Sequence, residues 1–217
     1  MSSEAMEQDP PKPLTLEEFL ALVPVSRETA SKFEHYLDLL TKWNRTINLV
    51  SKGSLADPWR RHILDCAQLA ELIPSGHKRV LDLGSGAGLP GIILALLCPD
   101  KSFHLIESDQ RKAAFLREVA RALKCEITIH AERIEDIIER FSNINAVTAR
   151  ALAPLPALIK LIKPILNEKK LCIFPKTRGI KDELEQLEQG WVASSRIVPS
   201  LSDPRGEILV LEAKKGA

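Results

Sequence analysis

The sequence has few aromatic residues, few cysteines and no excess of charge of either sign. Aromatic residues make up 5% of the 217 residues, and 30 Lys and Arg face 29 Asp and Glu, a formal net charge of +1. This balance excludes a polybasic tail protein, so any basic surface must be local. With 45% hydrophobic residues, a chain of this length buries a substantial core, which excludes a disordered or fibrous protein.

The four cysteines and the apolar runs point to a cellular compartment. Cys66, Cys98, Cys125 and Cys172 form no CxxC pair and have no companion histidines at zinc-finger spacing, so we expect reduced thiols and no metal site. The longest apolar run, residues 89–99, contains a glycine and two prolines and is shorter than the ~20 residues of a membrane span. We expect no signal peptide and a cytoplasmic protein.

Three regions follow one another along the chain. Residues 1–13 are polar and contain three prolines, which predicts a disordered tail. Residues 14–76 form a predicted helical extension: Thr15 and Glu18 are spaced as a capping box, Ser26 is the expected N-cap of a second helix, and a third helix is expected over residues 61–72. Residues 77–217 form the main domain.

The main domain alternates short strands with amphipathic helices. Strands are predicted over residues 79–83, 102–106, 126–129, 146–148 and 171–174, and helices over residues 90–97, 110–123, 132–141, 155–165 and 180–188. This order predicts an α/β fold with a doubly wound, mostly parallel sheet. The last two strand-like runs, 192–198 and 207–211, have no helix between them and predict an antiparallel hairpin, as in the class I, Rossmann-like methyltransferase sheet.

A glycine loop follows the first predicted strand and opens a helix. Residues 84–91 read GSGAGLPG and satisfy both the dinucleotide fingerprint and the S-adenosylmethionine loop. The glycines begin directly after the strand, and Asp82 at its end would repel a pyrophosphate but tolerate a sulfonium. We therefore favour S-adenosylmethionine, with Glu107 at the end of the second strand as the acceptor for the ribose hydroxyls.

Four segments resemble one family. Residues 43–49 (WNRTINL), 61–65 (RHILD), 81–91 (LDLGSGAGLPG) and 149–151 (ARA) are similar, in this order, to the bacterial 16S rRNA guanine-N7 methyltransferases, also called glucose-inhibited division protein B. The resemblance implies methyl transfer from S-adenosylmethionine to N7 of one guanine in small-subunit rRNA. The partner would be 16S rRNA or the small ribosomal subunit, and we expect a monomer without a metal.

The resemblance, together with the glycine loop, gives three sets of expected site residues. The expected cofactor-binding residues are Asp82, Gly84, Gly86, Gly88, Leu89, Glu107, Ile134, Glu135 and Arg150. The expected RNA-binding residues are Asn44, Asn48, Arg60, Arg61, His62, Lys176 and Arg178. The expected catalytic residues are Arg150, His62 and Lys176.

The chemistry of N7 agrees with what the sequence lacks. N7 of guanine carries a lone pair and no proton, so its attack on a methyl group needs no general base, and Arg150 is assigned to positioning. Basic residues in segments 41–62 and 169–181 predict a basic rim for RNA. Three alternatives stay open: an NAD-dependent dehydrogenase, a non-catalytic ribosome-assembly RNA-binding protein, and a methyltransferase acting on a small molecule or protein. Packing or capping roles also stay open for Trp43, Trp59, Phe174, Asn44 and Asn48, and a structural ion pair with Asp82 or Glu107 stays open for Arg150.

Overall fold

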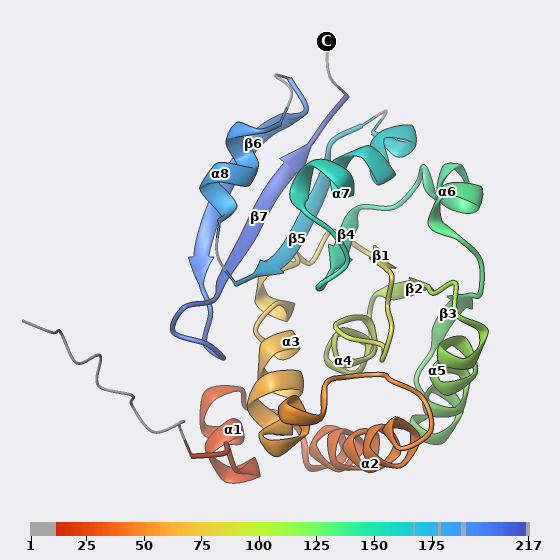
Figure 1. The fold of residues 1–217 in the computed structure, drawn as a ribbon, viewed down its shortest axis with the longest axis vertical. Helices are drawn as coiled ribbons and strands as arrows, with labels where there is room; N and C mark the ends of the chain where they lie inside the picture. Colours follow the sequence, from red (N-terminus) through yellow and green to blue (C-terminus); the bar gives the residue numbers. More distant parts are fainter. Residues whose placement is uncertain (1–11, 167, 178, 188–189, 216–217) are drawn as a thin grey trace, which may run out of the picture.

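The computed structural model describes residues 12–166, 168–177, 179–187 and 190–215. Its centre is a seven-stranded sheet in the order β3-β2-β1-β4-β5-β7-β6 (Figure 1). The strands are β1 (Arg79–Leu83), β2 (Ser102–Ile106), β3 (Ile127–His130), β4 (Ala146–Ala149), β5 (Lys170–Lys176), β6 (Val192–Pro199) and β7 (Glu207–Ala213). The predicted doubly wound α/β fold is confirmed. Most of the predicted tail, residues 1–11, lies outside the described residues.

Helices cover both faces of the sheet, because side chains alternate between two apolar clusters along each buried strand. Val80 of β1 belongs to the cluster that also holds residues of α4 (Gly91–Leu97) and α5 (Gln110–Leu123). Leu81 and Leu83 belong to the opposite cluster, with α6 (Ile134–Ile137), α7 (Leu155–Ile162) and α8 (Ile180–Glu185). The parallel strands are thus buried on both sides. Their carboxyl ends lie along one edge of the sheet, where folds of this class bind ligands, and we call it the functional edge.

The N-terminal extension packs on the sheet domain. The predicted caps are confirmed: Thr15 and Glu18 form a capping box at α1 (Leu16–Leu22), and the Ser26 side chain accepts from the backbone N–H of Thr29 at the start of α2 (Arg27–Asn44). Buried residues of α2 share one cluster with α4 and α5. The extension therefore completes the core of the sheet domain, and Figure 1 shows α2 lying beside α4 and α5.

The third predicted helix differs in the structure. In place of one α-helix over residues 61–72, the chain forms a π-helical turn (Trp59–Leu64), a short α3 (Asp65–Ala67) and a 3-10 turn (Ala70–Leu72). An additional 3-10 turn, Lys52–Ala56, precedes it. The predicted helices over 132–141 and 155–165 likewise finish as 3-10 turns, Ile138–Phe141 and Lys163–Ile165. None of the described helices is long and apolar enough to cross a bilayer.

The C-terminal hairpin is antiparallel, as predicted. Strand β7 lies between β5 and β6 and runs opposite to both, with Lys176 paired to Glu207 and Pro199 paired to the same residue. Because β7 runs backwards, it begins where β5 ends. The β6–β7 loop, residues 200–206, is thereby placed at the functional edge, beside the end of β4.

Candidate active site

The glycine loop joins β1 to α4 in the predicted conformation. Gly84, Gly86 and Gly88 have φ values of +60°, +55° and +80°, the left-handed region that favours glycine. A Cβ added at Gly88 would lie 2.3 Å from Cδ1 of Ile92, whereas one added at Gly86 would meet no atom nearer than 3.9 Å. The loop is packed tightly against α4 and open above Gly86, as a backbone cradle for a ligand requires.

Two side chains fix this loop from opposite sides. Glu107 is 7% exposed, and its carboxylate accepts from the backbone N–H groups of Gly86 and Asp109, both at 2.8 Å. Two of its four lone-pair sites remain for ribose hydroxyls. Buried Tyr36 of α2 donates its hydroxyl to the carbonyl of Ala87 at 2.8 Å. The N-terminal extension thus contributes directly to the shape of the loop.

Asp82 lies behind the loop and is fully buried. Its Oδ1 accepts from Oγ1 of Thr148 at 2.7 Å, and its Oδ2 has no hydrogen-bond partner in the described part of the chain. A Cβ added at Gly91 would come within 2.9 Å of that Oδ2, which places the carboxylate beneath the first turn of α4. Burial raises the pKa of Asp82 to about 6. Contact between Asp82 and the cofactor stays a prediction.

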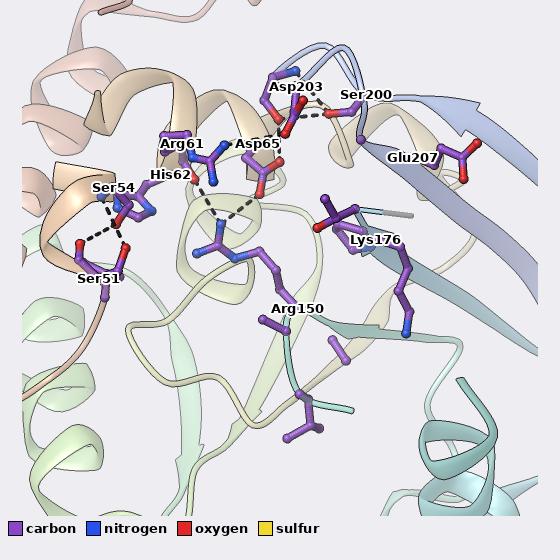
Figure 2. Close-up of a pocket in the computed structure, with 18 of the residues that line it drawn as sticks. Ser51, Ser54, Arg61, His62, Asp65, Arg150, Lys176, Ser200, Asp203 and Glu207 are labelled. Atoms are coloured by element: carbon purple, nitrogen blue, oxygen red, sulfur yellow. Dashed lines mark hydrogen bonds and ion pairs between the residues drawn. The ribbon is translucent and has the colours of Figure 1, made fainter. Parts of the chain in front are cut away.

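A pocket of about 480 Å³ opens at the carboxyl ends of β4 and β5 (Figure 2). Its walls come from the 3-10 and π-helical turns of the extension, the segment after β4, the end of β5 and the β6–β7 loop. The polar side chains that line it belong to Ser51, Ser54, Arg61, His62, Asp65, Arg150, Lys176, Thr177, Ser200, Ser202, Asp203 and Glu207. Three expected RNA-binding residues, Arg61, His62 and Lys176, therefore meet Arg150 in one cavity.

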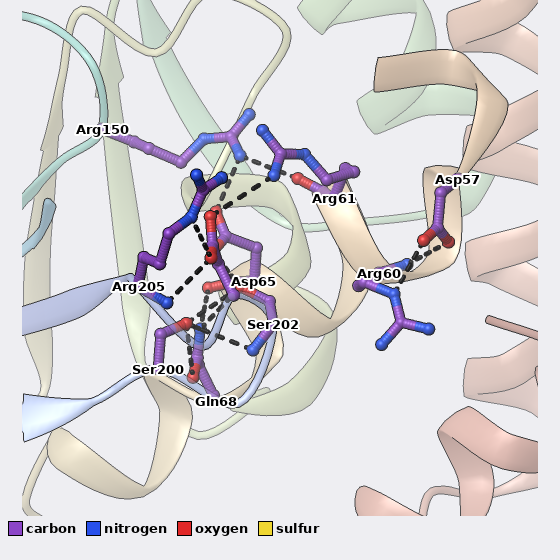
Figure 3. A network of polar contacts seen from close by, with 10 residues as sticks. Asp57, Arg60, Arg61, Asp65, Gln68, Arg150, Ser200, Ser202 and Arg205 are labelled. Carbon is purple, nitrogen blue, oxygen red and sulfur yellow. Dashed lines mark hydrogen bonds and ion pairs between the residues drawn. The ribbon is translucent and has the colours of Figure 1, made fainter. Parts of the chain in front are cut away.

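Arg150 is tied to the extension by a short ion pair. Its Nη1 donates to Oδ2 of Asp65 at 2.8 Å and to the carbonyl of Arg61 at 3.0 Å. The other oxygen of Asp65 accepts from Oγ of Ser202 at 2.6 Å. Gln68 continues the network to the backbone N–H of Leu201 at 2.7 Å (Figure 3). One carboxylate thus joins the end of β4, the extension and the β6–β7 loop.

His62 is a neutral imidazole in the pocket wall. The residue is 2% exposed, and neither ring nitrogen has a hydrogen-bond partner among the described residues. Burial, followed by the positive charge of Arg150, lowers the pKa of His62 to about 4. At neutral pH the ring carries no charge, and a base of this pKa is a weak proton acceptor.

Lys176 lines the pocket and is paired with Glu183 of α8. Nζ of Lys176 donates to Oε2 of Glu183 at 2.8 Å and to the carbonyl of Ala153 at 3.1 Å. The same Oε2 accepts from the backbone N–H of Leu155 at 2.6 Å, which ties it to the start of α7. Each of the two cations deepest in the pocket, Arg150 and Lys176, therefore has its own carboxylate.

The segment after β4 separates the glycine loop from the pocket. Ala151 has a left-handed φ of +53°, which few residues other than glycine adopt. The turn directs Leu152 over the loop: a Cβ at Gly84 would lie 2.6 Å from Cδ1 of Leu152, which also lines the pocket. The loop and the pocket are consequently neighbours, and Leu152 lies between them.

Several expected site residues lie elsewhere. The Asn44 side chain accepts from the backbone N–H groups of Leu49 and Val50 at 2.8 and 3.0 Å, so it shapes the turn after α2. Arg60 donates to Asp57 at 2.7 Å and does not line the pocket. Trp59 and Phe174 pack, the first against Phe19 and the second in the core. Three more expected residues do not line the pocket: Asn48, which is exposed, and Ile134 and Glu135 at the start of α6. Arg178 lies outside the described residues.

The comparisons with known proteins identify the family. The family model for rRNA small subunit methyltransferase G, GidB, matches residues 29–208. Ribosomal RNA small subunit methyltransferase G of Parvibaculum lavamentivorans is 43% identical over 209 residues, 95% of this chain and 92% of that protein. The protein of the same name from Paramagnetospirillum magneticum is 47% identical over 202 residues, 92% of this chain and 97% of that protein. The chain belongs to the rRNA small subunit methyltransferase G family.

A solved structure agrees with the fold of this methyltransferase G family member. The O-methyltransferase of Bacillus cereus, in complex with S-adenosylhomocysteine, has a TM-score of 0.62 and 14% identity, and the match covers 91% of this chain and all of that one. Family membership decides between the two interpretations of the glycine loop: the cofactor is S-adenosylmethionine, and the dehydrogenase alternative falls away.

Sequence reasoning missed several residues of this methyltransferase G site. Tyr36, Gln68 and Ser202 all help to hold the site in place, yet their partners are 51, 133 and 137 residues away in the chain. Such contacts leave no local spacing to recognise. Tyr36 offered the one usable signal, a polar-tipped aromatic on the buried stripe of a helix, since a buried hydroxyl normally has a partner.

Proposed function

We propose that this chain transfers a methyl group from S-adenosylmethionine to N7 of one guanine in small-subunit rRNA. The observation that carries the proposal is a pocket next to the glycine loop in which the cations Arg150 and Lys176 are each held by a carboxylate. His62, the histidine that lines this pocket, has a pKa of about 4. N7 needs no deprotonation, so a histidine that is a poor proton acceptor is compatible with this reaction.

The residues present fit S-adenosylmethionine, which supplies an electrophilic methyl group on a sulfonium. The open backbone at Gly86, the left-handed turns at Gly84 and Gly88, and the free lone pairs of Glu107 form its seat. Leu89 is proposed to contact the methionine and ribose part, and Ile134 and Glu135, at the start of α6, the adenine. Asp82 holds the loop beneath this seat.

The residues of the chain act by aligning the guanine with the cofactor. Holding N7 in line with the methyl group supplies ~7–11 kcal/mol without proton transfer. Arg150 is fixed by Asp65, and its remaining N–H groups are available for O6 of the guanine or a phosphate. Leu152 lies at the boundary between the two ligand seats and is placed to exclude water from the reacting atoms.

Charge neutrality in the pocket suits the product. The 7-methylguanine ring is cationic, and an unpaired Arg or Lys beside it would oppose its formation. Here Arg150 is paired with Asp65 and Lys176 with Glu183, both at 2.8 Å. The paired cations can position an anionic RNA without placing a net positive charge against the product.

RNA reaches this pocket through the extension and the β6–β7 loop, which form its rim. We propose 16S rRNA, free or within the small subunit, as the partner of a monomeric enzyme in the cytoplasm. The exposed basic residues Lys52 and Arg61 lie on the same side of the pocket and contribute the local positive charge that a neutral protein needs for RNA.

The test is incubation of the protein with methyl-labelled S-adenosylmethionine and small subunits from cells that lack it, followed by nucleoside mass analysis. We expect label in 7-methylguanosine. Binding of small subunits without incorporation would favour the non-catalytic assembly factor. Label in a protein or a small molecule would move the target to another class.

A further inference from the structure

Three guanidinium groups gather around two carboxylates at the rim of the pocket (Figure 3). Arg150 has a short pair with Asp65 at 2.8 Å. Arg61 and Arg205 both approach a single carboxylate, Asp203, and each remains 3.7 Å from it. The cluster thus carries one positive charge more than it neutralises.

The two contacts to Asp203 are loose. A distance of 3.7 Å exceeds the 2.7–3.2 Å of an N–H···O hydrogen bond. The side chains of Arg61 and Arg205 are 51% and 69% exposed. Among the described residues, neither guanidinium donates a hydrogen bond. The N–H groups of both arginines are therefore available to a ligand, and both side chains share one carboxylate.

The position of Asp203 is set by its own turn. Its Oδ1 accepts from the backbone N–H of Arg205 at 2.9 Å, and its carbonyl accepts from the N–H of Gly206 at 2.8 Å. The side chain would hold its place without either arginine. Asp203 therefore acts as a fixed counter-ion for two exposed cations.

We infer that Arg61 and Arg205 form a clamp for one backbone phosphate of the RNA beside the target guanine. In the absence of RNA, Asp203 is their counter-ion. This inference rests on the proposed function. A backbone phosphate has two non-bridging anionic oxygens and binds guanidinium groups through two parallel hydrogen bonds. Arg61 and Asp203 line the same pocket as Arg150, so the phosphate belongs to a nucleotide next to the base in the pocket.

Hydrogen bonds connect the clamp to the part of the pocket that holds Arg150. Ser202, one residue before Asp203, donates to the Asp65 carboxylate that holds Arg150. Gln68 accepts from the N–H of Leu201 in the same loop. The seat of the phosphate and the seat of the base are therefore held at a fixed spacing, which is what in-line alignment of one chosen guanine requires.

The experiment measures binding to small subunits lacking the modification, as a function of salt, for three proteins: the full chain, Arg205→Ala and Asp203→Asn. Asn keeps the oxygen that accepts from the N–H of Arg205. Lys78→Ala and Asp100→Asn are the matched controls, because this exposed ion pair lies just before β1 and β2, at the amino end of the parallel strands. Affinity for S-adenosylhomocysteine checks that each variant is folded.

We expect opposite effects from the two rim variants. Arg205→Ala weakens binding about fivefold and lowers the salt slope by about 1, because one phosphate contact is lost. Asp203→Asn strengthens binding by about two- to fivefold, the range that exposed ion pairs span. The controls leave both quantities unchanged.

A purely structural role for Asp203 predicts the reverse. If Asp203→Asn weakens binding as Arg205→Ala does, or if neither changes the affinity or the salt slope, the clamp is overturned. These outcomes are separate from failure of the proposed function, because binding is read without turnover: a chain that binds small subunits but methylates nothing would still reveal the clamp.

Discussion

The two ends of the site are built by different means. Around the glycine loop the contacts are short and made to backbone: Glu107 accepts from the N–H of Gly86, and Tyr36 donates to the carbonyl of Ala87. Around the pocket they are ion pairs and side-chain hydrogen bonds between segments far apart in the chain, such as Arg150 with Asp65 and Ser202 with Asp65.

This difference follows from what each end must hold. A cofactor of constant shape suits a seat made by backbone turns, which few substitutions other than at glycine can alter. A nucleotide within a large RNA suits a seat that the extension and the β6–β7 loop build with charged side chains. The glycine loop of the shared fold thus supplies most of the cofactor end, with Tyr36 of the extension bonded to it, and the extension and the β6–β7 loop complete the target end around Arg150 and Lys176.

The largest expected effect is at the cofactor end. Gly88→Ala places a Cβ 2.3 Å from Ile92 in a left-handed turn, so we expect a loss of about 3 kcal/mol of unfolding free energy and of S-adenosylhomocysteine binding. Denaturant unfolding and calorimetry check both. Gly76→Ala, where a Cβ meets no atom within 4 Å, serves as the control. An equally stable, ligand-binding Gly88→Ala variant would refute the packed loop.

The next effect is at the target end. Arg150→Ala leaves Asp65 without its cation and removes the group that positions the base, and we expect kcat/KM for methyl transfer to fall about 100-fold. Steady-state methylation of small subunits measures it. Arg196→Ala, an exposed arginine on β6, is the control and should retain full activity.

A pH dependence follows from His62. Because its pKa is lowered from 6.5 to about 4, the unfolded chain binds a proton between these values that the folded chain does not, and stability falls as pH falls. From pH 7 to pH 5 the contribution is about 2 kcal/mol. Asp82, with its pKa raised to about 6, has the opposite slope.

Variants isolate the His62 contribution from that of Asp82. From pH 7 to pH 5, the unfolding free energy of His62→Phe should fall less than that of the unchanged chain. Replacement of exposed His35 by Gln should leave the difference as it was. Equal slopes in all three proteins would mean that His62 is protonated in the folded state.

The smallest expected effect is at Tyr36, which connects the extension to the glycine loop. Tyr36→Phe removes the buried hydrogen bond to Ala87, at a cost of about 1 kcal/mol. We expect a matching, severalfold loss of S-adenosylhomocysteine affinity in calorimetry, because the loop loses its contact with the extension. A loss of stability with full affinity would confine Tyr36 to packing.

Much of the fold could be predicted because its signals are local. The capping box at Thr15, the glycine turns at Gly84 to Gly88, and a hairpin without a crossover helix each leave a pattern within a few residues. The π-helical turn Trp59–Leu64 leaves none, since one added residue in a turn does not change which side chains are apolar. The sequence accordingly indicated one helix where three different turns occur.

The candidate site was predictable in its members more than in its arrangement. Family resemblance indicated Arg150, His62 and Lys176, which do share the pocket, but not that Arg150 pairs with Asp65 rather than with Asp82 or Glu107. The same limit applies to Asn44, whose amide is used within its own turn. Partners distant in sequence are chosen by tertiary packing, which no local spacing records.

The most direct test of the account is one paired measurement on Arg150→Ala and the unchanged chain: S-adenosylhomocysteine affinity by calorimetry and 7-methylguanosine formed on small subunits. If the cofactor end and the target end are built independently, the variant binds S-adenosylhomocysteine as tightly as the unchanged chain and forms about 100-fold less 7-methylguanosine. Loss of both together would contradict the account, because it would make Arg150 part of the cofactor seat.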